Sequence, residues 1–338
     1  MSARTPERQT PERILQRLEW QVIRRLDGLL QGDYRSLFYG YGVDFADLRE
    51  YQPEDDIRYI DWNVTARMDT PYVRQYIEDR EITAWFLLDL SASMNFGVAQ
   101  NFKQAVLTDF VATFARLLTR HGNRVGALFY TGQSLPRSGS ISNGRKPARQ
   151  GLDLVIPASG GRNHVLRLIN DLLRQTLHEQ DSRQATFTNL ATLIEGGLHI
   201  LKKRSLVFVI SDFFSAPGWD RPLRLLNQRH EVLGIRILDP RELELPEIGP
   251  IIIEDAESGE QVYVDTYDKG FRGRFREVVK QHEDELNATF SRAGIDLLSI
   301  STDDDLVRSI MRFASIRKQR PGKRVSGVYT RGRTRPAG

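Results

Sequence analysis

The sequence predicts an α/β fold with a doubly wound, mostly parallel sheet. Between residues 81 and 316, short apolar runs alternate with segments long enough for helices of three or more turns. The runs are apolar at nearly every position, which is typical of strands that helices cover on both faces. With 338 residues, the chain is long enough to bury a sizeable core in such a domain.

Apolar runs and helical spacing predict the elements in chain order. The expected strands are 85–90, 124–130, 152–157, 205–211, 232–238 and 295–300. The helices expected with them are 101–122, 162–177, 189–203, 219–229, 268–293 and 303–317. An inserted β-hairpin is expected from 251–255 and 261–265, joined through Ser258 and Gly259.

The segments on either side of this α/β region lack its regular alternation of strands and helices. Residues 1–11 are predicted to be disordered, and 12–80 to form an N-terminal amphipathic helix (12–30) with an irregular extension. The α/β domain then spans 81–316, and a basic disordered tail spans 317–338. Within the extension, PEDDIRYIDW is interpreted as a surface turn of self-paired charges with Trp62 packed beneath; a buried Arg–carboxylate network fits the spacing equally well.

The net charge of +4 is unevenly distributed. Residues 317–338 hold eight Lys or Arg and no acid, so the rest of the chain has 40 basic against 44 acidic residues. A solubilising tail is the favoured interpretation, ahead of contact with nucleic acid or anionic lipid, and no specific nucleic-acid partner is expected.

Composition also limits where the protein is expected in the cell and which metal sites it can form. No apolar run approaches membrane-spanning length and the N-terminus is polar, which predicts a cytoplasmic protein without a transmembrane segment. The absence of cysteine excludes disulfides and thiolate metal sites. The six histidines lie far apart and lack ligand spacing, so they are interpreted as ordinary.

Two predicted strands end in a carboxylate. Asp89 follows the run Phe86–Leu88, and Asp212 follows the strand 205–211. In a doubly wound sheet the first and fourth strands are neighbours at the switch point, where ligands bind beyond the carboxyl ends. The two carboxylates would repel each other there, and a shared cation would resolve the repulsion.

Hydroxyl groups extend this predicted site. Ser91 and Ser93 alternate with Asp89, so an extended turn aims all three the same way. Thr188, just before a helix, supplies a third hydroxyl, with Thr186 as a less favoured alternative. All these ligands are oxygens, which suits Mg²⁺ or Mn²⁺ and not Zn²⁺. For Asp89 and the two serines, the competing interpretation is local turn and capping chemistry.

The pattern resembles the metal-ion-dependent adhesion site of von Willebrand factor A-type domains. It consists of D-x-S-x-S after the first strand, a threonine before a helix, and S-D after the fourth strand. The resemblance implies a von Willebrand factor A-like fold in which two serines and a threonine surround the ion and two aspartates lie nearby, often bound through water. It also implies that a partner's acidic side chain completes the metal shell. The five residues are Asp89, Ser91, Ser93, Thr188 and Asp212.

Further blocks resemble the bacterial domain-of-unknown-function 58 family. They are YGYGVDFADLREYQPEDDIRYIDW and the residues up to 81, and the D-P-x-E-x-x-L-P region within 230–260. Members are typically encoded beside MoxR-type AAA+ ATPases. The resemblance therefore implies a metal-dependent protein-interaction module, an adaptor or cofactor of such an ATPase, and no enzyme activity.

The alternative function is a metal-dependent hydrolase or phosphotransferase with Asp89 as nucleophile. Aspartyl-phosphate enzymes usually carry a second aspartate two residues later, where this chain has Ser91. They also use a distant lysine, which Lys202 or Lys203 could supply only weakly. No His or Glu lies near these strand ends in sequence to act as an acid or base, so binding is favoured over catalysis.

Overall fold

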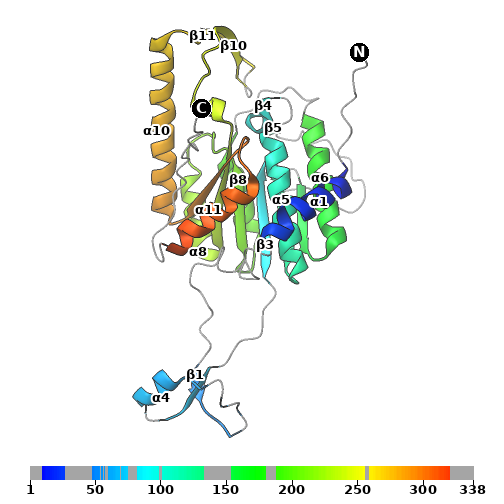
Figure 1. Cartoon of the computed structure of the whole chain (residues 1–338), viewed down its shortest axis with the longest axis vertical. Helices are drawn as coiled ribbons and strands as arrows, with labels where there is room; N and C mark the ends of the chain where they lie inside the picture. The colour runs from blue at the N-terminus through cyan, green and yellow to red at the C-terminus, as the bar shows by residue number, and fades with distance from the viewer. Residues whose placement is uncertain are drawn as a thin grey trace, which may run out of the picture.

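The computed structural model of the chain has a six-stranded sheet at its centre, in the order β12-β9-β8-β3-β6-β7 (Figure 1). Described are residues 10–26, 48–53, 55, 57, 60–68, 70–74, 82–98, 101–132, 154–179, 188–255 and 259–319. The strands are β3 (Thr83–Asp89), β6 (Arg124–Tyr130), β7 (Leu154–Ser159), β8 (Leu206–Ser211), β9 (Glu231–Leu238) and β12 (Asp296–Ser301). All neighbours pair in parallel except β7, which is antiparallel to β6. The predicted α/β class, with the first and fourth strands adjacent, is confirmed.

Helices cover both faces of this sheet, as the apolar strands require. One layer is built from α1, η1, α5, α6 and α11, and the other from α7, α8 and α10. Their bounds are α1 (Pro11–Leu18), the π-helix η1 (Glu19–Ile23), α5 (Lys103–Arg120), α6 (Arg162–Glu179), α7 (Leu190–Ile200), α8 (Asp220–Arg229), α10 (Lys269–Ala293) and α11 (Leu306–Gln319). No helix among the described residues is long and apolar enough to cross a membrane.

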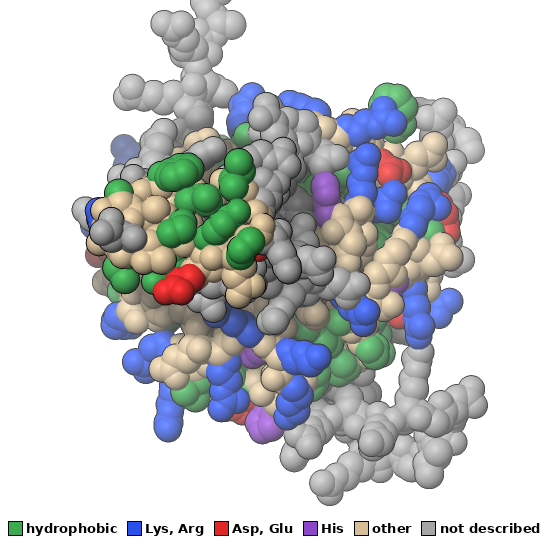
Figure 2. Space-filling model, turned by 90° about the horizontal axis from the view of Figure 1, so that it is seen from below, with side chains coloured by type: hydrophobic (Ala, Val, Ile, Leu, Met, Phe, Trp, Pro, Cys, Tyr) green, Lys and Arg blue, Asp and Glu red, His purple; other side chains and the backbone are tan. Residues whose placement is uncertain are grey.

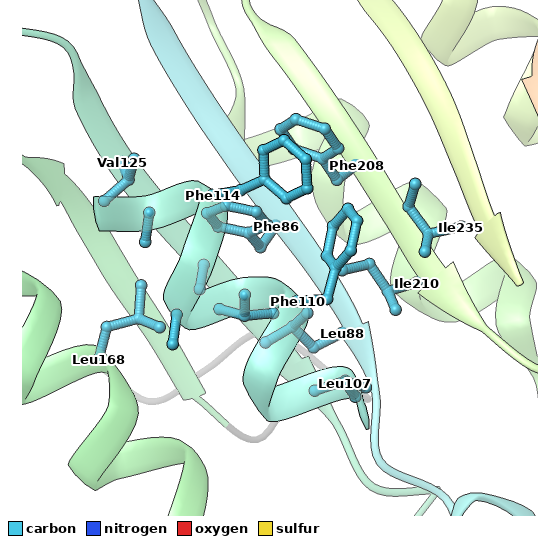
Figure 3. Close-up of a cluster of buried hydrophobic side chains, with 14 of the residues drawn as sticks. Phe86, Leu88, Leu107, Phe110, Phe114, Val125, Leu168, Phe208, Ile210 and Ile235 are labelled. Atoms are coloured by element: carbon cyan, nitrogen blue, oxygen red, sulfur yellow. The ribbon is translucent and has the colours of Figure 1, made fainter. Parts of the chain in front are cut away.

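Successive side chains of each strand point into different layers. Phe86 and Leu88 of β3 belong to the first core, whereas Leu87 between them belongs to the second. In the first core, the rings of Phe86 and Phe208 stack with centroids 5.1 Å apart, and Phe110 and Phe114 of α5 pack beside them (Figure 3). This aromatic packing fixes α5 against the two central strands β3 and β8.

The predicted N-terminal helix is part of the first core. It begins at Pro11, where the Thr10 side chain accepts a hydrogen bond from the Arg13 N–H, so the expected disorder does not extend to residues 10 and 11. Its buried apolar face packs with α5 and α6, and Glu19 pairs with Arg116 at 3.1 Å. Residues 1–9 and 320–338, the remainder of the predicted disordered ends, lie outside the described part of the chain.

Small elements complete the carboxyl end of the sheet. The predicted hairpin is present as antiparallel β10 (Pro250–Glu254) and β11 (Gln261–Asp265). A second, short hairpin joins β4 (Gly97–Val98) to β5 (Asn101–Phe102), so that α5 begins two residues later than predicted. Two short turns, η3 (Ala92–Asn95) and α9 (Pro240–Leu243), follow β3 and β9 respectively.

The extension before β3 contains β1 (Leu48–Glu50), α4 (Trp62–Met68) and β2 (Tyr72–Arg74), drawn apart from the sheet in Figure 1. The prediction that Trp62 packs beneath a charged turn is wrong, because its side chain is 69% exposed. Asp61 instead caps α4 by accepting a hydrogen bond from the Val64 N–H, and Trp62, the first residue of the helix, is exposed. Figure 2 shows hydrophobic side chains gathered at this projecting end.

Two glycine-to-alanine substitutions should shift stability in opposite directions. A Cβ at Gly234 in β9 would lie 2.4 Å from the ring of Phe290, which is fully buried, so Gly234→Ala should lower the free energy of unfolding by about 1–3 kcal/mol. Gly273 in α10 is exposed with open space around it, so Gly273→Ala should raise that free energy by about 0.5–1 kcal/mol. Urea unfolding of both variants checks the packing of α10 on the sheet; equal effects would contradict it.

Candidate functional site

Asp89 ends β3 in the middle of the sheet and is completely buried. Its Oδ1 accepts a hydrogen bond from the Ser91 N–H at 3.0 Å, and its Oδ2 accepts one from the Ser211 hydroxyl at 2.6 Å. The first bond is the local turn chemistry considered as an alternative. The second joins the ends of β3 and β8, so it is a tertiary contact that turn chemistry alone does not explain.

The serines of the D-x-S-x-S motif lie in the turn that follows. Ser91 precedes η3 and is buried, and Ser93 lies within η3 and is partly buried. Their two hydroxyl oxygens are 3.2 Å apart. The alternating positions therefore bring both hydroxyls together beside Asp89, as the sequence predicts.

Asp212 follows β8 and is also completely buried. Its Oδ1 accepts a hydrogen bond from the Phe214 N–H at 3.0 Å. Between them, Phe213 has a left-handed backbone with φ 63°, which is unfavourable for a bulky residue. Its ring packs against Trp219 and Phe290, and its N–H donates to the Ser211 hydroxyl, so packing holds the turn that positions Asp212.

Thr188 lies directly before the cap of α7 and is buried. Its carbonyl accepts hydrogen bonds from the Ala216 N–H at 2.9 Å and the Ser215 hydroxyl at 3.1 Å. The loop after Asp212 therefore anchors the threonine segment to the same end of the sheet. The alternative residue, Thr186, lies outside the described part of the chain.

The cation in this cluster is Lys103, which the sequence analysis missed. Its ammonium group is fully buried and lies 2.8 Å from Oδ2 of Asp212. It also forms an ion pair with Glu242 of α9. The sequence contains an indication of this role. Lys103 lies on the helical stripe of buried residues that continues through Leu107, Phe110 and Phe114, and a charged residue on such a stripe needs a buried partner of opposite charge.

The lysines considered for this role lie elsewhere. Lys202 and Lys203 follow α7 and precede β8, which places them at the amino end of the parallel strands. Asp89 is at the carboxyl end, about 20 Å away along a six-residue strand. They cannot contact Asp89.

Glu242 ties a further segment to the site. Asp239, the residue after β9, forms a capping box with Glu242, so three adjacent strands (β3, β8 and β9) are each completed by a buried aspartate. Asp239 also accepts hydrogen bonds from Arg241 and from the Thr302 hydroxyl. Lys103 thus connects the start of α5 to the turn that leads into the β10–β11 hairpin.

The charges of the cluster do not balance. When all three are ionised, Asp89, Asp212 and Glu242 carry three negative charges against the one positive charge of Lys103, which leaves −2. Burial raises the pKa of Glu242, although Lys103 opposes this effect. Burial, and then repulsion from Asp212, raise the pKa of Asp89 to about 6. Burial lowers the pKa of Lys103, but the carboxylates of Asp212 and Glu242 outweigh it and raise that pKa, so the lysine stays protonated.

The donor set fits a hard divalent cation. Asp89, Ser91, Ser93, Thr188 and Asp212 offer only oxygen ligands, and the uncompensated charge of the cluster matches that of Mg²⁺. Within the described ranges, no group of three or more His, Cys, Asp or Glu side chains is placed to hold a metal ion. Hydroxyl oxygens would therefore have to complete the coordination, as the sequence motif suggests.

Comparison with known proteins identifies the family. The family model described as "Protein of unknown function DUF58" matches residues 47–285. This protein belongs to the DUF58 family. The match begins at β1 and includes the whole sheet except β12, so the projecting extension and the carboxylate cluster are both within the DUF58 region.

Relatives of this DUF58 protein occur in mycobacteria. Uncharacterized proteins of Mycobacterium tuberculosis and Mycobacterium bovis are each 36% identical over 305 residues, which is 90% of this chain and 89% of theirs. Among solved structures, BatB from Bacteroides thetaiotaomicron has 11% identity and a TM-score of 0.38, over 71% of this chain and all of its own. The pilus adhesin SpaC from Lactobacillus rhamnosus GG has 9% identity and a TM-score of 0.39, over 72% of this chain and 31% of its own. Similarity at this level does not indicate a function.

The two aspartates should differ in their effect on stability. Asp212→Asn breaks a buried ion pair and should lower the free energy of unfolding by about 3–5 kcal/mol. Asp89→Asn removes a charge that the site compensates poorly. Because the pKa of Asp89 is raised to about 6 in the folded protein, the folded state holds its proton more tightly, and stability falls as the pH rises from about 4 through 6, by at most about 3 kcal/mol.

Urea unfolding in EDTA at pH 4 and pH 8 separates these effects. The difference in unfolding free energy between Asp89→Asn and the wild type should shift in favour of the variant from pH 4 to pH 8, because only the wild type ionises Asp89 over that range. At pH 8, Asp212→Asn should be the less stable of the two variants. Equal losses in the two variants, or a pH-independent difference for Asp89→Asn, would contradict the charge distribution described above.

Proposed function

We propose that this protein is a metal-dependent protein-interaction module without catalytic activity. In this proposal, Mg²⁺ or Mn²⁺ binds at Asp89, Ser91, Ser93, Thr188 and Asp212, and the ion offers an open coordination position to an Asp or Glu of a partner protein. The observation that carries it is the pair of buried carboxylates on neighbouring strands, which Lys103 neutralises only in part.

The chain's own residues would prepare the site for an anionic partner. Ser211 and the Ser91 N–H hold the Asp89 carboxylate, and Lys103 and the Phe214 N–H hold that of Asp212. Both carboxylates are therefore oriented before any ligand arrives, which reduces the ordering cost of binding. With the charge of the cluster at −2, a divalent ion brings it to neutrality and makes the approach of a carboxylate favourable.

Membership of the DUF58 family directs the choice of partner. The resemblance implies encoding beside MoxR-type AAA+ ATPases, and we propose that this protein acts as an adaptor or cofactor of such an ATPase. The D-P-x-E turn and the β10–β11 hairpin lie at the same end of the sheet as the cluster (Figure 1). They would therefore lie next to a protein bound through the metal.

The hydrogen bonds of Asp89 favour binding over the hydrolase alternative. A nucleophilic aspartate needs an oxygen free to attack the substrate, whereas both carboxylate oxygens of Asp89 accept hydrogen bonds from the protein. Lys103 is a buried cation of the kind that such an enzyme needs, but Asp212 and Glu242 both bind it. Its ammonium group is not free to bind a phosphoryl group in this arrangement.

Mg²⁺ should stabilise the wild-type protein but not the Asp89→Ala variant. Metal binding to the folded state raises the melting temperature by mass action, and the loss of the Asp89 carboxylate removes both charge and orientation from the site. Thermal melts with EDTA and with Mg²⁺ measure this effect. Asp303→Ala is a matched control, because Asp303 is an exposed acid at the same end of the sheet. If Mg²⁺ does not raise the melting temperature of the wild-type protein, the proposed metal site is wrong.

The ATPase partnership requires a separate measurement. A MoxR-type ATPase encoded beside this protein should bind it in Mg²⁺ and dissociate in EDTA, and Asp89→Ala should weaken binding by about tenfold or more. Size-exclusion chromatography and calorimetry with the purified pair measure both effects. Binding that is equally strong in EDTA and in the variant would show that the interaction does not use this site.

Phosphatase assays test the alternative function. The wild-type protein should release no phosphate from p-nitrophenyl phosphate in Mg²⁺ or Mn²⁺ above the level of a buffer control. Turnover that is present in the wild type and lost in Asp89→Asn would instead support the hydrolase function, since an asparagine cannot act as the nucleophile.

A further inference from the structure

A second candidate site lies at the opposite end of the sheet from the carboxylates. α7 and α8 pack together, and a cavity of ≈ 390 Å³ lies where their carboxyl-terminal ends meet the starts of β8 and β9. Figure 2 looks at this end of the molecule and shows many Lys and Arg side chains on it and few acidic ones. The cavity is lined by Leu198, Leu201, Lys202, Arg204, Arg229 and His230.

His230 is the unusual member of this lining. The residue is only 5% exposed, yet neither Nδ1 nor Nε2 of its ring has a hydrogen-bond partner among the described residues. Burial, and then the neighbouring Arg229, lower the pKa of His230, so the ring is neutral, with one donor and one acceptor nitrogen. An unsatisfied buried polar group costs about 1–3 kcal/mol, so this ring would gain stability from a hydrogen-bond partner beside the cavity.

The basic side chains of the cavity have no acidic partner in its lining. Lys202, Arg204 and Arg229 form no side-chain hydrogen bond or ion pair with any described residue, and no acid lines the cavity. The carboxyl-terminal ends of α7 and α8 attract cations, but each is equivalent to only about −0.5 charge. The three side chains are exposed to water, and about two of their positive charges have no acidic partner in the cavity lining.

We propose that this cavity binds a small phosphate monoester. Arg204 and Arg229 each present a planar guanidinium that can donate two hydrogen bonds to phosphate oxygens. His230 lines the buried side of the cavity, where its two unpaired ring nitrogens lack a hydrogen-bond partner.

The rest of the lining and the net charge define the ligand class. Leu198 and Leu201 form an apolar wall, which suits the organic part of an ester better than free phosphate does. A phosphate monoester carries a charge of about −1.5 to −2 near neutral pH, which matches the surplus of the cavity, whereas a carboxylate would neutralise only half of it. This site is independent of the proposed metal site, because the sheet separates them.

Isothermal titration calorimetry with three probes tests the proposal: phenyl phosphate, inorganic phosphate and benzoate, in EDTA at constant ionic strength. Phenyl phosphate should bind most tightly and benzoate most weakly. Arg204→Gln and Arg229→Gln should each weaken phenyl phosphate binding by about tenfold or more, since each removes a charged hydrogen-bond donor. Both side chains are exposed, so the variants should fold normally.

Lys203→Gln is the matched control, because Lys203 is exposed, adjacent in sequence and outside the cavity lining. It should leave binding within about twofold of the wild type, as should Asp303→Ala, which changes an exposed acid at the other end of the sheet. No binding of phenyl phosphate, equal weakening in Lys203→Gln, or benzoate binding as tight as phenyl phosphate would each overturn the proposal. The first outcome would show that no phosphate site exists, the second that binding is to a diffuse basic surface, and the third that the site is one for carboxylates.

Discussion

The ion pair between Lys103 and Asp212 is the constraint on which the carboxyl end of this fold depends. Both side chains are completely buried, and a charge at that depth needs an opposite charge beside it. The pair requires α5 to begin near the carboxyl end of β8, and the packed rings of Phe86, Phe110 and Phe208 hold the helix there. Through Glu242, the same ammonium group fixes α9 and the base of the β10–β11 hairpin. One buried cation thus joins three segments that are far apart in the sequence.

The parallel sheet also gives the molecule two chemically distinct ends. At the carboxyl end, the turns after β3, β8 and β9 each begin with a buried aspartate, and negative charge exceeds positive charge. At the amino end, the segment after α7 and the last turn of α8 present Lys202, Arg204 and Arg229 around a buried histidine. This separation follows from strand direction, because all strands except β7 begin at one edge and end at the other.

Much of the architecture was predictable from local pattern, and the errors have specific causes. β7 is shifted by two residues from its predicted position because it is an antiparallel edge strand, where Pro157 can be accommodated without a lost ladder bond. α11 begins at Leu306 because the Asp305 side chain accepts a hydrogen bond from the Arg308 N–H and caps the helix there. Trp62 was expected beneath a turn of self-paired charges, but it lies exposed on α4, because the direction of a side chain on a helix of two turns depends on what the helix packs against.

The sequence by itself determined the α/β class, the adjacency of the strands that end in Asp89 and Asp212, and the grouping of Ser91 with Ser93. Those features follow from the period of two in a strand and from the strand order of a doubly wound sheet, which are local or topological rules. Only the tertiary structure decided that Lys103 is the cation between Asp212 and Glu242, and that His230 is buried without hydrogen-bond partners. Both depend on how helices pack across the sheet, because burial and ion pairing are set by groups more than a hundred residues away or on different elements, and no spacing in the sequence encodes those distances.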